Sequence, residues 1–159
     1  MANIIWLTLQ GRNQGLISAG CASLDSIGNK SQSGHRDQIM VMTVNHGLSR
    51  ALNVNHQCLT FVKPLDKSSP LLGKAICENE VLDCEFSFYR TNPSGLNECY
   101  YLLKLLNARI SSIHLQVPHV IDDSKGQPEE IIELSYESIN WEHHIAGTSA
   151  YSLWEEQVF

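Results

Sequence analysis

The residues in this chain that could do chemistry are its seven histidines and five cysteines. A metal ion needs histidine, cysteine or carboxylate ligands at short, defined spacings. His143 and His144 are adjacent, and because neighbours on a strand point to opposite faces they cannot readily share one ion. His35, His46 and His56 are spread over loops with no carboxylate or cysteine at ligand spacing, and the cysteines form no CxxC pair. The sequence therefore predicts neither a metal site nor a bound cofactor.

Catalytic and nucleotide-binding motifs are also incomplete. Ser18 is followed by Gly20 but lacks the glycine two residues before it, so it forms no nucleophile elbow. Gly73-Lys74 is followed by Ala75, where a phosphate-binding loop has serine or threonine. The paired acids Glu129-Glu130 flank a turn and are expected to be solvating charges. These observations predict a protein that is not an enzyme.

The charge of the chain is unevenly distributed. Eleven Lys and Arg face 17 Asp and Glu, a net charge of −6, and no basic stripe indicates a nucleic-acid partner. Residues 1–119 hold ten basic and eight acidic side chains, a net of +2, whereas residues 120–159 hold one and nine, a net of −8. Two interpretations stay open: a solvated acidic face, or a contact in which this end meets a more basic surface on a second copy.

Nothing in the sequence predicts membrane insertion. The longest apolar stretch, residues 100–103, ends at Lys104, far short of the ~20 residues that a bilayer requires. Residues 1–6 have no basic start and no long apolar stretch, so we expect no secretory signal peptide. An odd number of cysteines without a metal motif is typical of thiols in a reducing compartment, which predicts folding in a cytoplasm.

The elements that must position these residues are mostly strands. Residues 82–90 and 112–117 alternate between apolar and polar residues, which predicts half-buried strands. From 131 to 143 the apolar set changes parity at Glu137-Ser138, which predicts a β-bulge or a strand that changes sheets. The one expected helix runs from Ser69 to about Asn79, with Ser68 or Ser69 as its cap and Pro70 in its first turn.

Three further predicted strands, residues 2–9, 39–44 and 99–106, are apolar on both faces. A single helix of about three turns cannot cover them all. Either another copy of the chain covers the second faces, or the strands cross within the core under the chain's own loops. The residues alone thus predict one β-rich domain with one helix.

Several segments, in order along the whole chain, resemble the haemolysin-coregulated protein (Hcp) family, which forms the tube of bacterial type VI secretion systems. The block Lys63-Pro64-Leu65-Asp66-Lys67-Ser68-Ser69-Pro70 is the most specific of these segments. The others are residues 2–7, 14–21, 32–35, 45–49, 134–141 and 146–149. The resemblance implies a mainly β fold: a compact β-barrel of two packed antiparallel sheets with one flanking α-helix at about residues 69–79.

The resemblance also implies function. Subunits would form homohexameric rings that stack into a tube within a contractile sheath and baseplate, and are expelled with a VgrG-type spike, carrying small effectors in the lumen. The protein would be cytoplasmic before firing and then exported without a cleaved signal. Residues 1–159 would form a single domain with no C-terminal toxin extension. The second faces of the two-sided strands would line ring contacts, and the candidate interface residues are Trp6, Met40, Met42, Leu102 and Leu106.

Two other functions are open from the residues alone. A monomeric β-barrel could bind a small ligand in its interior, and a metal-assisted hydrolase could use the loop histidines. A solution mass near that of the monomer would favour the first. Stoichiometric zinc, with activity lost on chelation, would favour the second.

Overall fold

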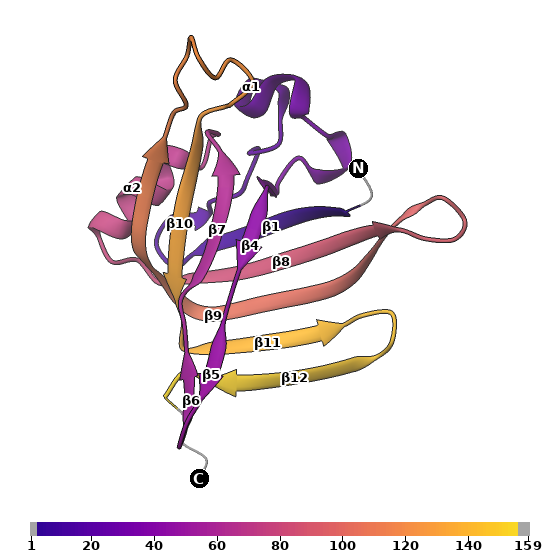
Figure 1. The fold of residues 1–159 in the computed structure, drawn as a ribbon, viewed down its shortest axis with the longest axis vertical. Coiled ribbons are helices and arrows are strands. Elements are labelled where there is room, and N and C mark those ends of the chain that lie inside the picture. Colours follow the sequence, from indigo (N-terminus) through magenta and orange to yellow (C-terminus); the bar gives the residue numbers. More distant parts are fainter. Residues whose placement is uncertain (1–2, 156–159) are drawn as a thin grey trace.

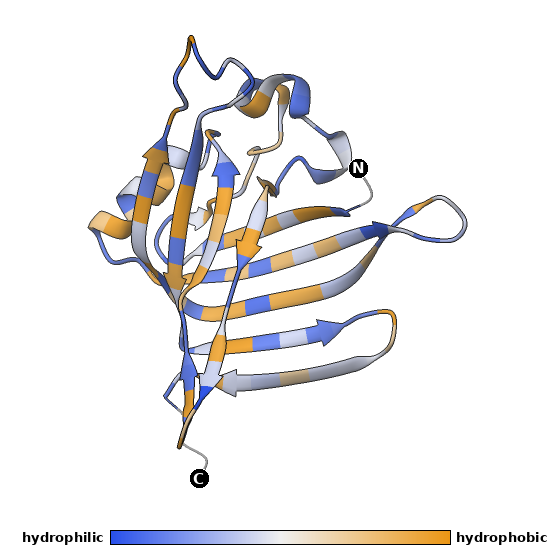
Figure 2. Cartoon of the chain, in the orientation of Figure 1, coloured by the Kyte–Doolittle hydropathy of each residue, from blue (hydrophilic) through white to orange (hydrophobic). Residues whose placement is uncertain are grey.

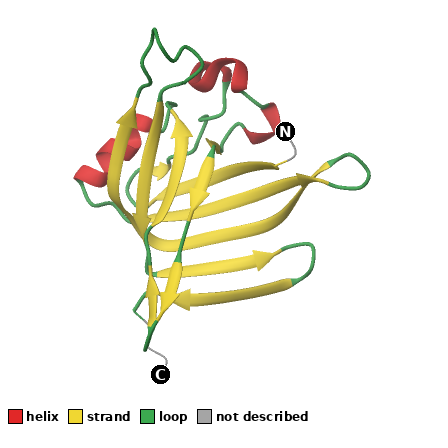
Figure 3. Ribbon diagram, viewed as in Figure 1, coloured by secondary structure: helices red, strands yellow, loops and turns green. Residues whose placement is uncertain are grey.

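The computed structural model describes residues 3–155, which fold mostly as strands (Figures 1 and 3). The strands are β1 (Asn3–Gly11), β2 (Gly15–Leu16), β3 (Ile39–Val41), β4 (Thr43–Asn45), β5 (Leu48–Arg50), β6 (Val54–His56), β7 (Leu59–Pro64), β8 (Leu82–Thr91), β9 (Asn97–Gln116), β10 (Glu129–Ser135), β11 (Ser138–His143) and β12 (Thr148–Leu153). The helices are α1 (Leu24–Ile27) and α2 (Ser69–Cys77), with 3-10 turns at Gly28–Lys30 and Ser33–His35. No helix among these residues is long and apolar enough to cross a membrane.

Two antiparallel sheets share the 20-residue strand β9. Sheet A has the order β12, β11, the first part of β9, β8 and β1, with β2 and β3 on the far side of β1. Sheet B has the order β10, β7 and β4 after the last part of β9. Figure 1 shows the strands of sheet B crossing those of sheet A steeply. The predicted two-sheet architecture with one main helix is confirmed, and sheet A does not close, because β12 is an edge strand.

The corner of β9 lies at Asn107, whose φ of 49° is in the left-handed region that asparagine tolerates better than most residues. Its backbone N–H donates to Asp83 Oδ1 at 3.1 Å, and its side-chain amide donates to Glu137 Oε2 at 2.7 Å. These two bonds tie the bend to β8 and to the segment between β10 and β11.

The alternation predicted for residues 82–90 is confirmed over the first part of β8, where Leu82, Cys84 and Phe86 are buried, but Ser87 of the opposite face is buried too. Figure 2 shows apolar and polar residues distributed along the strands of both sheets. The change of parity at residues 137–138 is also confirmed. Of the two expected causes, a β-bulge or a strand that changes sheets, the structure shows the second. β10 belongs to sheet B and β11 to sheet A, so the chain changes sheets between them. Residues 112–116 form the end of β9, but Leu115 is 61% exposed, because this end extends beyond the core.

The core lies between the two sheets. Phe86 of β8 and Phe61 of β7 meet there in a T-shaped pair, with ring centroids 5.5 Å apart. Leu7 and Leu103 flank Phe86 in register on the neighbouring strands, and both are buried. The interior that a small ligand would need in a monomeric barrel is thus occupied by the chain's own side chains.

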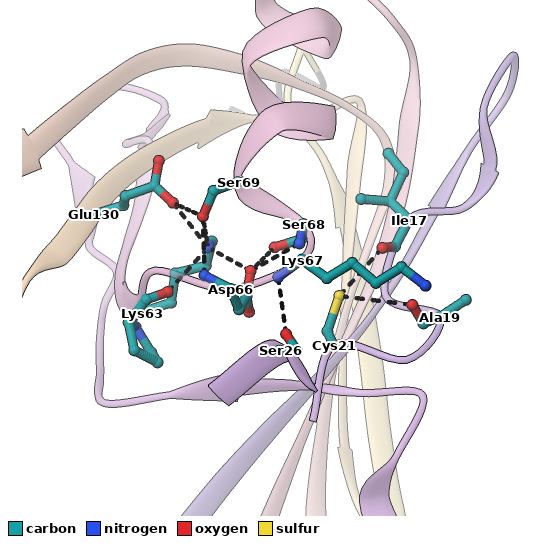
Figure 4. Close-up of polar contacts among 11 residues, drawn as sticks. Ile17, Ala19, Cys21, Ser26, Lys63, Asp66, Lys67, Ser68, Ser69 and Glu130 are labelled. Atoms are coloured by element: carbon teal, nitrogen blue, oxygen red, sulfur yellow. Dashed lines mark hydrogen bonds and ion pairs between the residues drawn. The ribbon is translucent and has the colours of Figure 1, made fainter. Parts of the chain in front are cut away.

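A buried ionic network joins β7 to the start of α2 (Figure 4). The Lys63 ammonium, fully buried, donates to Asp66 Oδ1 and to Glu130 Oε1, each at 2.9 Å. It also donates to Ser69 Oγ at 3.1 Å. Ser68 occupies the N-cap position as expected, but its hydroxyl bonds to Asp66 and makes no helix-capping bond. The expected capping mechanism is therefore replaced by the network around Lys63.

Candidate assembly interface

The five candidate interface residues lie mostly on the outer face of sheet A. In the strand register, Met40 pairs with Trp6, Trp6 with Ser87, and Ser87 with Leu102. Directly paired residues point to the same side of a sheet. Leu106, four residues along β9 from Leu102, points to that side too.

Trp6 differs from the other candidates because it is fully buried within the chain. The His35 ring stacks on it, with centroids 4.6 Å apart and planes 10° from parallel. His35 bonds to Gln38, and Gln38 donates to Thr8 Oγ1 at 3.2 Å, which holds the segment in place. Within the single chain, the outward face of Trp6 is therefore covered by the chain's own loop, and its place in an interface stays a prediction.

The remaining four candidates are accessible to different degrees. Leu106 is 49% exposed and Met42 38%, whereas Met40 and Leu102 are partly buried. Met42 lies at the turn from β3 to β4, and its backbone N–H donates to Val62 O at 2.8 Å. Leu106 thus offers the largest accessible apolar surface of the set, on β9, two strands in from the edge strand β12.

The edge strand β12 was not predicted from the sequence. It pairs with β11, and the described residues place no strand on its other side. Tyr151 is 71% exposed and Leu153 40%. An unpaired edge presents free backbone N–H and C=O groups, which can pair with a strand of another chain. The available signal was Gly147, whose φ of 76° marks the turn of the β11–β12 hairpin.

The acidic C-terminal part does not form one surface. Asp122 and Asp123 lie in the loop between β9 and β10, whereas Glu142 lies on β11, at the other end of the molecule (Figure 1). Glu130 is buried against Lys63 and contributes no free surface charge. The charge asymmetry of the sequence is therefore dispersed in the fold.

The other residues that could take part in chemistry, the histidines and cysteines, lie at several separate places among the described residues. Among residues 3–155, no group of three or more histidine, cysteine, aspartate or glutamate side chains could hold a metal ion. His143 contacts Tyr100 and Tyr101, and its neighbour His144 is exposed. His46 and His56, which the sequence places ten residues apart in loops, both bond to the hydroxyl of Tyr136.

The thiols differ in burial and in pKa. Burial raises the pKa of the Cys21 thiol to about 12, with the nearby Asp66 carboxylate adding to the shift, and burial also raises that of Cys84. Cys77 is exposed. The thiolate is the nucleophilic form of cysteine. At neutral pH, the fraction of Cys21 present as thiolate is therefore about 1,000-fold smaller than for a thiol with the reference pKa of 9.0.

We therefore expect a brief iodoacetamide pulse at pH 7.5 to label Cys77 in the folded protein and to leave Cys21 and Cys84 unlabelled. Peptide mass spectrometry with and without denaturant measures the difference. A Cys77→Ser variant serves as the matched control, because the peptide around residue 77 should then carry no label, whereas the partly exposed Cys58 and Cys99 are unchanged. Rapid native labelling of Cys84 would contradict the register assigned to β8.

The fold and its exposed edge define a class: a two-sheet β-protein with a flanking helix and an open assembly edge. A crystal structure of an Hcp protein superposes on it with a TM-score of 0.92, at 33% identity over 98% of this chain and 99% of the other. The secreted protein Hcp3 from Pseudomonas aeruginosa gives 0.88, at 34% identity over 98% and 100%.

Sequence comparison identifies the family. The family described as "Type VI secretion system effector, Hcp" matches residues 6–143, and the chain belongs to it. The "Major exported protein" of Pseudomonas aeruginosa is 33% identical over 99% of both chains. The protein YhhZ of Escherichia coli (strain K12) is 41% identical over 93% of this chain, which spans only 37% of that relative's length.

Proposed function

We propose that this protein forms hexameric rings that stack into the inner tube of a type VI secretion system. Membership of the Hcp family supports this function. The observation that carries it is the open edge of sheet A: among the described residues β12 pairs with β11 on one side only, and Leu106 of β9 and Leu153 of β12, which both stand opposite Ser138 of β11, are exposed. The free backbone edge of β12 and the side chains of Leu106 and Leu153 lie outside the buried core and are therefore available to a second copy.

The partners follow from this role. They are other copies of the chain, a VgrG-type spike, contractile sheath and baseplate components, and small effectors carried in the lumen. We further propose that residues 1–159 act as one domain that folds in the bacterial cytoplasm and is exported without a cleaved signal peptide. The printed name of the "Major exported protein" supports the export step.

The first test is the solution mass of the reduced protein by size exclusion with light scattering. A ring gives a mass near six times the 17.8 kDa of one subunit. A monomer at high concentration would contradict self-assembly of rings.

The contact surface is tested by Leu106→Asp. If Leu106 is buried between copies, the new carboxylate loses its water there and the ring should dissociate, with affinity reduced about 100-fold or more. The matched control is Leu24→Asp, because Leu24 is 67% exposed on α1, away from β12. Far-ultraviolet circular dichroism shows that both variants are folded. A Leu106→Asp protein that stays hexameric would exclude Leu106 from the contact.

The dependence of the assembled mass on salt concentration distinguishes apolar contacts between subunits from charged ones. Because the acidic residues are dispersed and Glu130 is paired inside the subunit, we expect the assembled mass to persist at about 1 M salt, where the Debye length is about 3 Å. Dissociation at that concentration would show that charge pairs close the ring instead.

A further inference from the structure

The β5–β6 hairpin, residues 48–56, forms a two-stranded sheet of its own. Neither strand pairs with sheet A or sheet B among the described residues. Figure 1 shows the hairpin next to β12, below the ends of β4 and β7. Apart from its short chain connections to β4 and β7, the hairpin therefore depends on side-chain contacts for its position.

A cluster around Tyr136 supplies that attachment at the base of the hairpin. His46, just before β5, places Nε2 2.8 Å from the Tyr136 hydroxyl, and His56, at the end of β6, places Nδ1 2.7 Å from it. His56 Nε2 also lies 3.1 Å from Ser152 Oγ of β12. The Trp154 ring packs on both His56 and Tyr136, with centroids 5.8 and 4.8 Å away.

The surroundings of His46 and His56 favour the neutral form of both imidazole rings. Burial lowers the pKa of both histidines, and the neighbouring His56 lowers the pKa of His46 further. Burial raises the pKa of Tyr136, with a smaller contribution from Cys58, so its hydroxyl stays protonated. The charged groups that line the surface cleft beside Tyr136 are Arg12, Arg109, Glu137 and Glu155.

Proton counting shows why the doubly charged state does not fit. A hydroxyl carries one hydrogen and two lone pairs. With neutral rings, Tyr136 donates to one imidazole and accepts from the other. With both rings protonated, His46 and His56 each direct an N–H at the same oxygen, the tyrosine hydrogen loses its acceptor, and two cations are held side by side.

The geometry points to an acid-sensitive latch: His46 and His56 hold the β5–β6 hairpin on Tyr136 and β12 while neutral, and release it when both are protonated. The closed latch binds fewer protons than the open one, whose histidines titrate near 6.5. Opening is therefore favoured as the pH falls below about 6.5, by up to about 100-fold per pH unit for two protons. Release frees the hairpin, which carries the exposed Leu48 and Leu52.

Hydrogen–deuterium exchange of the purified full-length chain tests the latch. Exchange is measured at pH 7.5, 6.5 and 5.5 and corrected for the intrinsic pH dependence of exchange. Peptides covering residues 46–57 should lose protection steeply below pH 6.5, while peptides from β8 keep theirs. Equal protection of residues 46–57 at all three pH values overturns the latch, and parallel loss in β8 would show global acid unfolding instead.

Two variants isolate the histidines. His46→Gln/His56→Gln cannot take up the protons, so protection of the hairpin should no longer depend on pH. Tyr136→Phe removes the shared hydroxyl and should leave the hairpin open already at pH 7.5. If either variant fails to fold, NMR of the unmodified protein decides: the imidazole signals of His46 and His56 must titrate together with the hairpin amides, and titration without change in those amides overturns the proposal. The mass recorded at each pH separates hairpin opening from ring dissociation.

Discussion

Lys63→Ala should lower the free energy of unfolding by about 3–5 kcal/mol, a large part of the 5–15 kcal/mol that typically stabilises a domain. The Lys63 ammonium is the cation that faces Asp66 and Glu130, and the side chains of all three are at most 8% exposed. Removing it leaves two carboxylates buried without a counter-charge. Chemical denaturation followed by tryptophan fluorescence measures the loss.

Lys67→Ala is the matched control for this prediction. Lys67 belongs to the same segment between β7 and α2, but it is exposed, and a surface substitution of this kind changes stability by about 0.5 kcal/mol or less. The triple variant Lys63→Met/Asp66→Asn/Glu130→Gln removes the charges together and should recover much of the lost stability. Equal, small effects of Lys63→Ala and Lys67→Ala would contradict the buried network.

The network shows what local pattern could and could not predict. Leu59, Phe61 and Lys63 share one parity on β7, and all three are buried. A lysine at an inward position signals buried acidic partners. Asp66 is a local one, three residues along the chain, but Glu130 lies 67 residues from Lys63. The register of β7 with β10 brings the two together, and no local pattern specifies that register. The resemblance singled out this block without revealing why its residues are needed.

On the outer face of sheet A, too, the local sequence pattern predicted the direction of side chains but not their long-range contacts. Parity along β9 placed Leu102 and Leu106 outward, which the strand register supports. Parity also placed Trp6 outward, but the stacking of His35 over it depends on how a polar loop returns across β1. Strand β12 was missed because Thr148–Leu153 is mostly small or polar, and its pairing with β11 depends on the backbone rather than on apolar alternation.

Phe86→Ala should cost about 3–5 kcal/mol, the range found for phenylalanine truncations that leave a cavity in a close-packed core. Phe86 is fully buried and lies between the two sheets. Its T-shaped contact with Phe61, at 72° between the ring planes, adds about 0.5–1.5 kcal/mol of coupling between the two positions. A double-mutant cycle with Phe61→Ala measures that coupling from denaturation midpoints.

Two comparisons make the expected loss at Phe86 specific to the core. Phe88→Ala, on the same face of β8 but partly exposed, should cost less. Trp141→Ala should also cost less than parity alone predicts, because Trp141 points inward on β11 but stays half-buried, one strand from the open edge. The gradient follows from the open sheet: burial decreases from β8 toward β12, so the same apolar truncation loses less contact there. Equal losses at Phe86 and Trp141 in the isolated subunit would contradict the open edge.

In an assembled ring, a larger loss at Trp141 than in the isolated subunit would show that a second copy covers this end of the sheet.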